Sequence, residues 1–145
     1  MVPEIKVEAE SLKERYKTGE DIVIRVYLFS YGDDPLWVNA RMALNRPSGV
    51  GEMSFHIVDP SGKDIPFRAR VRIGAAKRDE FAFLHPWHCV GRQYDLEPNF
   101  EFDMSQPGQY RLTAEYRNDD AGDSWELGAW TGSQNAETIQ FEILP

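Results

Sequence analysis

Two histidines and the single cysteine are the side chains best suited to bind a transition metal. His85, His88 and Cys89 lie close together in the sequence, and a metal site would need His56 brought in from another strand. Their spacing matches no zinc motif, and Cys89 as a nucleophile would need a base that no local signature supplies. We therefore favour a surface turn with a half-buried cysteine over a metal site, and we predict no cofactor.

Acidic side chains raise two further kinds of chemistry. Asp119, Asp120, Asp123 and Glu126 could surround a calcium ion, but they lack the alternating register of a calcium loop, so a solvated hairpin turn is favoured. Glycoside hydrolysis needs two carboxylates held at reaction distance, and a large number of acidic residues is no evidence of such a pair. The chain has neither a glycine-rich phosphate loop nor a Gly-x-Ser-x-Gly elbow. We predict a protein that is not an enzyme, with a hydrolase using an unidentified acid pair as an alternative.

Tryptophan and arginine side chains are the candidate recognition residues, because these two types dominate binding hot spots. The predicted partner-binding residues are Trp37, Arg41, Arg111, Arg117 and Trp130. A shared face requires the strand around Trp37 to neighbour the strand around Arg111, as strands C and F do in immunoglobulin topology. The alternative is that a loop of the same chain, carrying Trp125 or Trp130, covers Trp37.

Alternation of apolar and polar residues with a period of two predicts the strands that must position these side chains. Residues 109–117 are typical of a half-buried central strand. Further strands are expected over residues 5–9, 22–29, 36–44, 53–57, 65–73, 81–84, 89–96 and 139–143. No long segment keeps a helical apolar stripe. We predict an all-β fold, an antiparallel immunoglobulin-like β-sandwich of about eight strands forming a single domain over residues 1–145.

The start of the 109–117 strand carries a possible corner motif. Gly108-x-Tyr110 resembles the tyrosine corner of immunoglobulin-like sandwiches, in which a tyrosine hydroxyl bonds to backbone a few residues upstream. Gln106 stands where that motif usually has an acid. We therefore expect the Tyr110 hydroxyl to contribute to stability.

Charge and hydropathy limit the partners. A net charge of −8 and a pI near 4.9 argue against nucleic acid, and no apolar run is long enough to span a membrane. The chain shows no secretion signal as written, so cytoplasmic residence is the expectation, with a secreted or periplasmic location if a leader had been trimmed. Cys89 is the only cysteine, which excludes an internal disulfide.

Residues 83–96 and 100–110 resemble a bacterial immunoglobulin-like domain. Their layout, with a Tyr94-Asp-Leu96 strand and a Gly-x-Tyr strand, is similar to the accessory domain of deuterolysin and peptidyl-Lys metalloendopeptidases. It is more loosely similar to intracellular proteinase-inhibitor domains. Trp87 stands where that family has a turn glycine, and the metal-binding His-Glu-x-x-His is absent from this chain. The resemblance implies a non-catalytic accessory, binding or inhibitory domain.

We predict a non-catalytic binding domain whose partner is another protein. The alternative partner is a carbohydrate, since sandwiches stack sugars on exposed tryptophans and the chain has four. Coplanar exposed aromatic rings would favour a sugar, and a flat patch of tryptophan and arginine with an acidic rim would favour a protein. Two close carboxylates with a raised pKa in a cleft would favour an enzyme.

Overall fold

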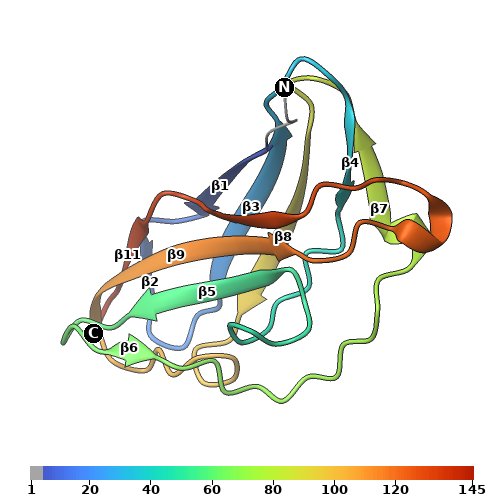
Figure 1. Ribbon diagram of the computed structural model, residues 1–145. Coiled ribbons are helices and arrows are strands. Elements are labelled where there is room, and N and C mark those ends of the chain that lie inside the picture. The colour runs from blue at the N-terminus through green and yellow to red at the C-terminus, as the bar shows by residue number, and fades with distance from the viewer. Residues whose placement is uncertain (1–4) are drawn as a thin grey trace.

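The computed structural model describes residues 5–145, and the regular secondary structure of these residues is almost entirely strand (Figure 1). One sheet has the order β1 (Ile5–Ser11), β3 (Ile22–Ser30), β8 (Cys89–Leu96). The second has the order β2 (Arg15–Tyr16), β11 (Ile139–Ile143), β9 (Gly108–Asn118), β5 (Met53–Val58), β6 (Asp64–Ile65), and β10 (Gly132–Asn135) also pairs with β9. A separate two-stranded sheet joins β4 (Leu36–Asn39) to β7 (Phe81–Leu84).

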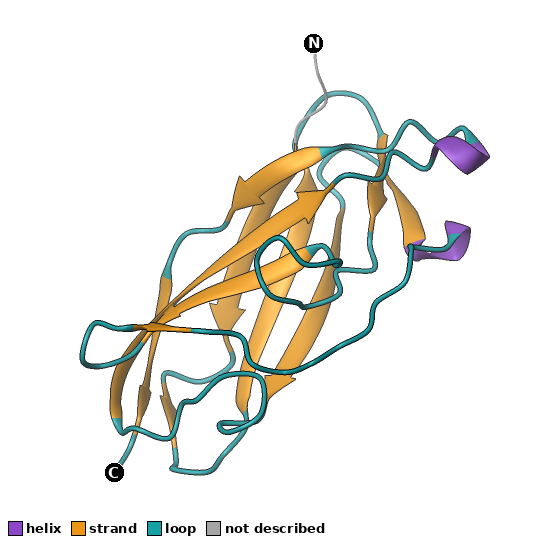
Figure 2. Cartoon of the chain, turned by 60° about the horizontal axis from the view of Figure 1, so that its bottom comes forward, coloured by secondary structure: helices purple, strands orange, loops and turns teal. Residues whose placement is uncertain are grey.

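Among the named strands of the described residues, pairing is antiparallel except between β2 and β11, and an isolated parallel bridge joins Leu44 to Met53. Two short 3-10 helices, η1 (Arg78–Glu80) and η2 (Asp123–Trp125), lie at one end of the molecule (Figure 2). Within residues 5–145, no helix is long and apolar enough to cross a membrane. The predicted all-β antiparallel sandwich is confirmed.

The core forms between the inner faces of the two larger sheets. Along β3, Ile22, Ile24, Val26 and Leu28 are fully buried and alternate with half-buried neighbours, as a period of two requires. The matching set on β9 begins at Tyr110 and ends at Tyr116. Residues from both strands belong to one continuous apolar cluster, so the two central strands predicted from alternation hold the sandwich together.

Tyr110 forms the corner that the sequence predicts. Its hydroxyl donates a hydrogen bond to the Gln106 carbonyl oxygen at 2.6 Å, and its ring stacks on Phe141 with centroids 5.5 Å apart. Burial raises the pKa of the Tyr110 hydroxyl to about 12. Gly108 has φ of +131°, and a Cβ there would lie 2.7 Å from Pro60, so the turn before the strand requires glycine.

Replacing Tyr110 by phenylalanine is expected to lower the free energy of unfolding by about 1 kcal/mol, the net value of a typical hydrogen bond. The ring would keep its packing, so the loss reports the hydroxyl alone. Urea denaturation measures the change, and Tyr31→Phe, which alters an exposed tyrosine, is the matched control with no expected shift. Equal midpoints for Tyr110→Phe and the wild type would mean that Tyr110 is merely packed.

Two predicted strands are shorter in the structure. The strand expected over 36–44 ends at Asn39, because the backbone turns at Met42 with φ of +50° and buries that side chain completely. The strand expected over 65–73 pairs only at Asp64–Ile65. Beyond it, the Arg68 N–H donates to the Glu101 carbonyl at 2.9 Å, which draws the chain toward the 97–105 loop and away from β5.

Candidate functional site

The predicted binding face does not form as one surface. Trp37 lies on β4, where it faces Phe83 of β7, whereas Arg111 lies on β9 between Val58 of β5 and Gln140 of β11. The premise that these strands are neighbours in one sheet is therefore wrong. The reason is that β5 and β11 already occupy the two edges of β9, which leaves β4 to pair with β7.

Trp37 is covered by its own chain, which is the alternative considered from the sequence. Its half-buried ring packs with Leu127 against a small cluster of Ala76, Phe81 and Ala129. The Arg78 guanidinium lies over the ring, 5.6 Å from its centroid. The segment that covers it also carries Trp130. The backbone N–H of Trp130 donates a hydrogen bond to the backbone carbonyl of Trp37 at 2.9 Å. Trp130 itself packs on the main core, with its ring 5.9 Å from that of Tyr116.

Arg41 and Glu52 form a buried ion pair. Arg41 Nε donates to Glu52 Oε1 at 2.9 Å and Nη2 donates to Oε2 at 2.7 Å, with side chains only 12% and 7% exposed. The hydrogen bond to the Glu52 carboxylate raises the pKa of Arg41. Arg41 Nη1 also donates to the Gly74 carbonyl at 2.6 Å. These contacts hold together three loops, so Arg41 has a structural task that its sequence position did not reveal.

Arg117 and Arg111 are exposed on β9. Arg117 Nη2 pairs with Asp119 Oδ2 at 2.9 Å, and Arg117 lines a polar cleft of about 370 Å³ together with Arg41 and Glu52. Arg111 does not line this cleft. The structure thus brings Arg41 and Arg117 together at this cleft and Trp37 and Trp130 together elsewhere, but it does not gather all five predicted residues. The binding role assigned to all five remains a prediction.

The acidic segment after β9 forms a compact turn. The Asn118 side-chain amide donates to the carbonyls of Asp120 and Trp130, and Asp120 Oδ1 accepts from the Gly122 N–H at 2.8 Å. Asp119 is engaged with Arg117. This arrangement agrees with the hairpin turn favoured from the sequence.

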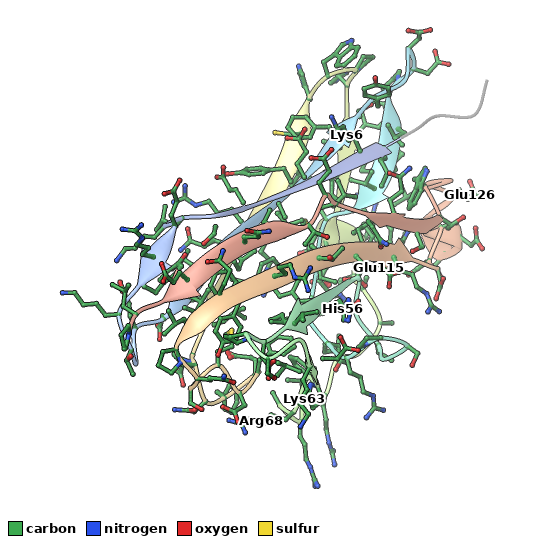
Figure 3. The ribbon with its side chains drawn as sticks, turned by 90° about the vertical axis from the view of Figure 1, so that its left-hand side faces the viewer. Lys6, His56, Lys63, Arg68, Glu115 and Glu126 are labelled. Carbon is green, nitrogen blue, oxygen red and sulfur yellow. The ribbon has the colours of Figure 1, made fainter. Side chains whose placement is uncertain are left out.

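The histidine and cysteine segment forms an exposed turn. The rings of His85 and His88 lie edge to face with centroids 5.6 Å apart. Cys89 is exposed, so its predicted half-burial is wrong: it begins β8 on the outward face of the sheet. His56 lies on β5 of the other sheet, 2.8 Å from Asp64 (Figure 3). Within residues 5–145, no group of three or more metal-ligating side chains is close enough to hold an ion.

Sequence reasoning missed an exposed group of aromatic side chains at the end of β7, in the β7–β8 turn and just after β3, which we call the aromatic surface. It consists of Tyr31, Phe83, His85, Trp87 and His88. Trp87 is 69% exposed, and its ring lies 5.3 Å from that of Tyr31, at an angle of 65°. The Trp87 backbone is left-handed, with φ of +67°. Tryptophan at the turn position where the resembled family has glycine was the signal that could have revealed this surface.

A second feature is a cleft of about 890 Å³ between the 45–50 loop and residues 67–74. We call it the arginine cleft, because four arginines line it and none of its lining residues is acidic: Arg46, Arg68, Arg70 and Arg72. Figure 1 shows residues 66–77 as a long green segment that crosses the bottom of the molecule between β6 and β7, far from the aromatic surface at the top. Arg68 lies on the side opposite Lys6 of β1 (Figure 3).

The pKa of Glu101, in the 97–105 loop, is raised. Burial of the carboxyl group is the main cause, and the negative charge of Glu97 raises this pKa further. Glu101 lines neither of the clefts described above. Three acids, Glu52, Asp119 and Asp120, do line the 370 Å³ cleft, but Glu52 is paired with Arg41 and Asp119 with Arg117. The hydrolase alternative therefore remains a hypothesis.

No family model matches the chain, and neither does any curated protein. Among solved structures, a mutant β-glucosidase from Listeria innocua in complex with laminaribiose matches with a TM-score of 0.50 and 12% identity, over 99% of this chain and 16% of that chain. A β-glucosidase from Erythrobacter marinus matches with a TM-score of 0.47 and 10% identity, over 98% and 16%. This chain therefore spans about 16% of the length of these enzymes. At such low identity the first likeness concerns the fold alone.

Proposed function

We propose that the chain is a non-catalytic binding domain and that the aromatic surface contacts another protein. The observation that carries this proposal is Trp87. An L-residue in the left-handed region costs about 1 kcal/mol or more, and a ring that is 69% exposed recovers little of that through packing. Stability alone would favour glycine at this position, so the tryptophan is best explained by an intermolecular contact.

The composition and geometry of the surface support a protein partner. Tryptophan and tyrosine are the aromatic residues that most often form hot spots, and both gather here. The rings of Tyr31 and Trp87 cross at 65°, so they make no coplanar platform for a sugar. Asp33 and Asp34 follow Tyr31 in the same exposed loop and give the surface an acidic rim.

A carbohydrate is the second candidate partner. A single exposed tryptophan ring can stack on a sugar, and the solved structure matched at a TM-score of 0.50 is a β-glucosidase in complex with laminaribiose. That likeness concerns the fold alone, so the exposed Trp87 ring is the feature of this chain that supports the second candidate.

The substitution Trp87→Gly separates binding from stability. It removes the ring and relieves the left-handed backbone, so the melting temperature should stay constant or rise. Affinity for the partner should fall by about 2 kcal/mol or more, as it does for truncated hot spots. The measurement is calorimetric titration of the wild type and the variant with the protein captured from the native host by the immobilised chain.

Phe100→Ala is the matched control, because Phe100 is 56% exposed but lies in the 97–105 loop outside the aromatic surface. This variant should bind the captured protein as the wild type does. An equal affinity for Trp87→Gly and the wild type would contradict the proposal. Binding of laminaribiose that depends on Trp87, without a protein partner, would instead favour the carbohydrate candidate.

A further inference from the structure

The segment over residues 66–77 is extended but has no strand partner. It is fixed at one end by the hydrogen bond from the Arg68 N–H to Glu101 and at the other by the Gly74 carbonyl, which accepts from Arg41. Between these anchors, in the described part of the chain, no backbone group of residues 69–73 takes part in a hydrogen bond. This stretch is therefore an open edge, shaped like a strand and able to pair with another one.

The middle of this edge faces outward. Arg70, Val71 and Arg72 are exposed, whereas Ala69 and Ile73 at its two ends are half-buried. Arg46 extends the positive charge from the opposite wall of the arginine cleft. The guanidinium of Arg68, unlike those of Arg70 and Arg72, already donates hydrogen bonds within residues 5–145, to the carbonyls of Asn99 and Phe100.

The charge of the cleft is opposite to that of the whole chain. Among the described residues, none of Arg46, Arg70 and Arg72 takes part in an ion pair, although the chain has a net charge of −8. Exposed apolar side chains, Val50 on one wall and Val71 on the other, lie among these arginines. An occupant complementary to this cleft would carry negative charge together with small apolar groups.

We propose that the arginine cleft binds an extended acidic segment of a partner protein, which adds to residues 69–73 as a β-strand. This inference rests on the proposed protein-binding function but uses a surface separate from Trp87. Side chains of paired strands share a face with their cross-strand neighbours, so acidic residues at every second position would face Arg70 and Arg72. Apolar residues between them would face Val71 and Val50.

Two other occupants fit less well. A second copy of the chain pairing through the same edge would set arginine against arginine across the strands, which is destabilising. A sulfated polysaccharide would satisfy the guanidinium groups but would leave the backbone groups of residues 69–73 without a ladder. An acidic peptide strand satisfies both the charges and the backbone.

The test uses the whole chain and a fluorescent, end-blocked heptapeptide in which glutamate alternates with valine. We expect saturable binding, seen as a rise in anisotropy, together with slower amide hydrogen exchange in residues 69–73. The same peptide with alternate backbone nitrogens methylated keeps its charge but cannot form a ladder, and it should bind at least tenfold more weakly. Equal binding of the two peptides would overturn strand addition.

The variant Arg70→Glu/Arg72→Glu should weaken peptide binding at least tenfold while its melting temperature stays constant, because both side chains are exposed. Arg111→Glu, an exposed arginine of β9 outside the cleft, is the control with no more than a small change. No binding at about 1 mM peptide would overturn the proposal. Tighter binding of a heparin oligosaccharide than of the peptide would also overturn the proposal and would indicate that the cleft binds a sulfated polysaccharide.

The outcome can be separated from that of the proposed function. Trp87→Gly should bind the heptapeptide as the wild type does, because the aromatic surface lies at the other end of the molecule (Figure 1). If the peptide fails to bind while Trp87→Gly still loses affinity for the captured protein, the proposed function stands and the arginine cleft does not serve it.

Discussion

Replacing Arg41 by alanine is expected to lower the free energy of unfolding by about 3–5 kcal/mol, the cost of breaking a buried ion pair by removing one partner. The Glu52 side chain is 7% exposed in the wild type, and in the variant its carboxylate would keep only the Ala43 N–H, which donates to it at 3.2 Å. A loss of this size is a large fraction of the free energy of unfolding of a typical domain. Urea denaturation of the purified variant measures the loss.

Arg117→Ala is the matched control for this prediction. Arg117 lines the same cleft and pairs with Asp119, but both side chains are largely exposed, so its removal should cost far less stability than the removal of Arg41. The double variant Arg41→Met/Glu52→Leu should recover much of the lost stability, because apolar replacement of a buried pair is often close to neutral. A loss for Arg41→Ala no greater than that for Arg117→Ala would show that water reaches Glu52.

Alternation in the sequence predicted the central strands because it reports directly which side chains are buried. β3 and β9 lie where residues 22–29 and 109–117 alternate, and the Tyr110 corner is confirmed by its hydrogen bond to Gln106. Both depend on contacts within one strand or one turn. Local signals of this kind can be read without knowing which strand lies next to which.

Alternation failed where the outcome depends on a distant partner. Residues 36–44 alternate throughout, yet the strand ends at Asn39, because Arg41 turns inward to meet Glu52 and the carbonyl of Met42 accepts from Tyr94 and Arg92. Residues 65–73 also alternate, although most of that stretch has no neighbour to pair with. A period of two indicates an extended segment with one polar and one apolar face, but it does not show whether a second strand lies beside that segment.

The aromatic surface could have been found in part from the sequence. Trp87 stands at the position of a turn glycine, but the burial of a tryptophan near a turn depends on whether another segment covers it. In the structure Trp37 is covered by its own chain, which is the alternative to an outward-facing binding residue, and Trp87 is exposed. The cover of Trp37 comes from residues 127–130, about ninety positions away.

Replacing Trp37 by alanine is therefore expected to destabilise the isolated chain by about 3 kcal/mol, the lower end of the range for a buried aromatic side chain. The ring is half-buried against the cluster of Ala76, Phe81 and Ala129, so its loss would open a cavity between β4 and the 127–130 segment and leave Arg78 without its cation–π partner. Thermal denaturation without any partner measures the loss, and Trp87→Ala, which removes the 69% exposed ring, is the matched control with little expected change. A nearly unchanged midpoint for Trp37→Ala would restore Trp37 as a candidate binding residue, because only a ring that contributes nothing to folding is free to serve a partner alone.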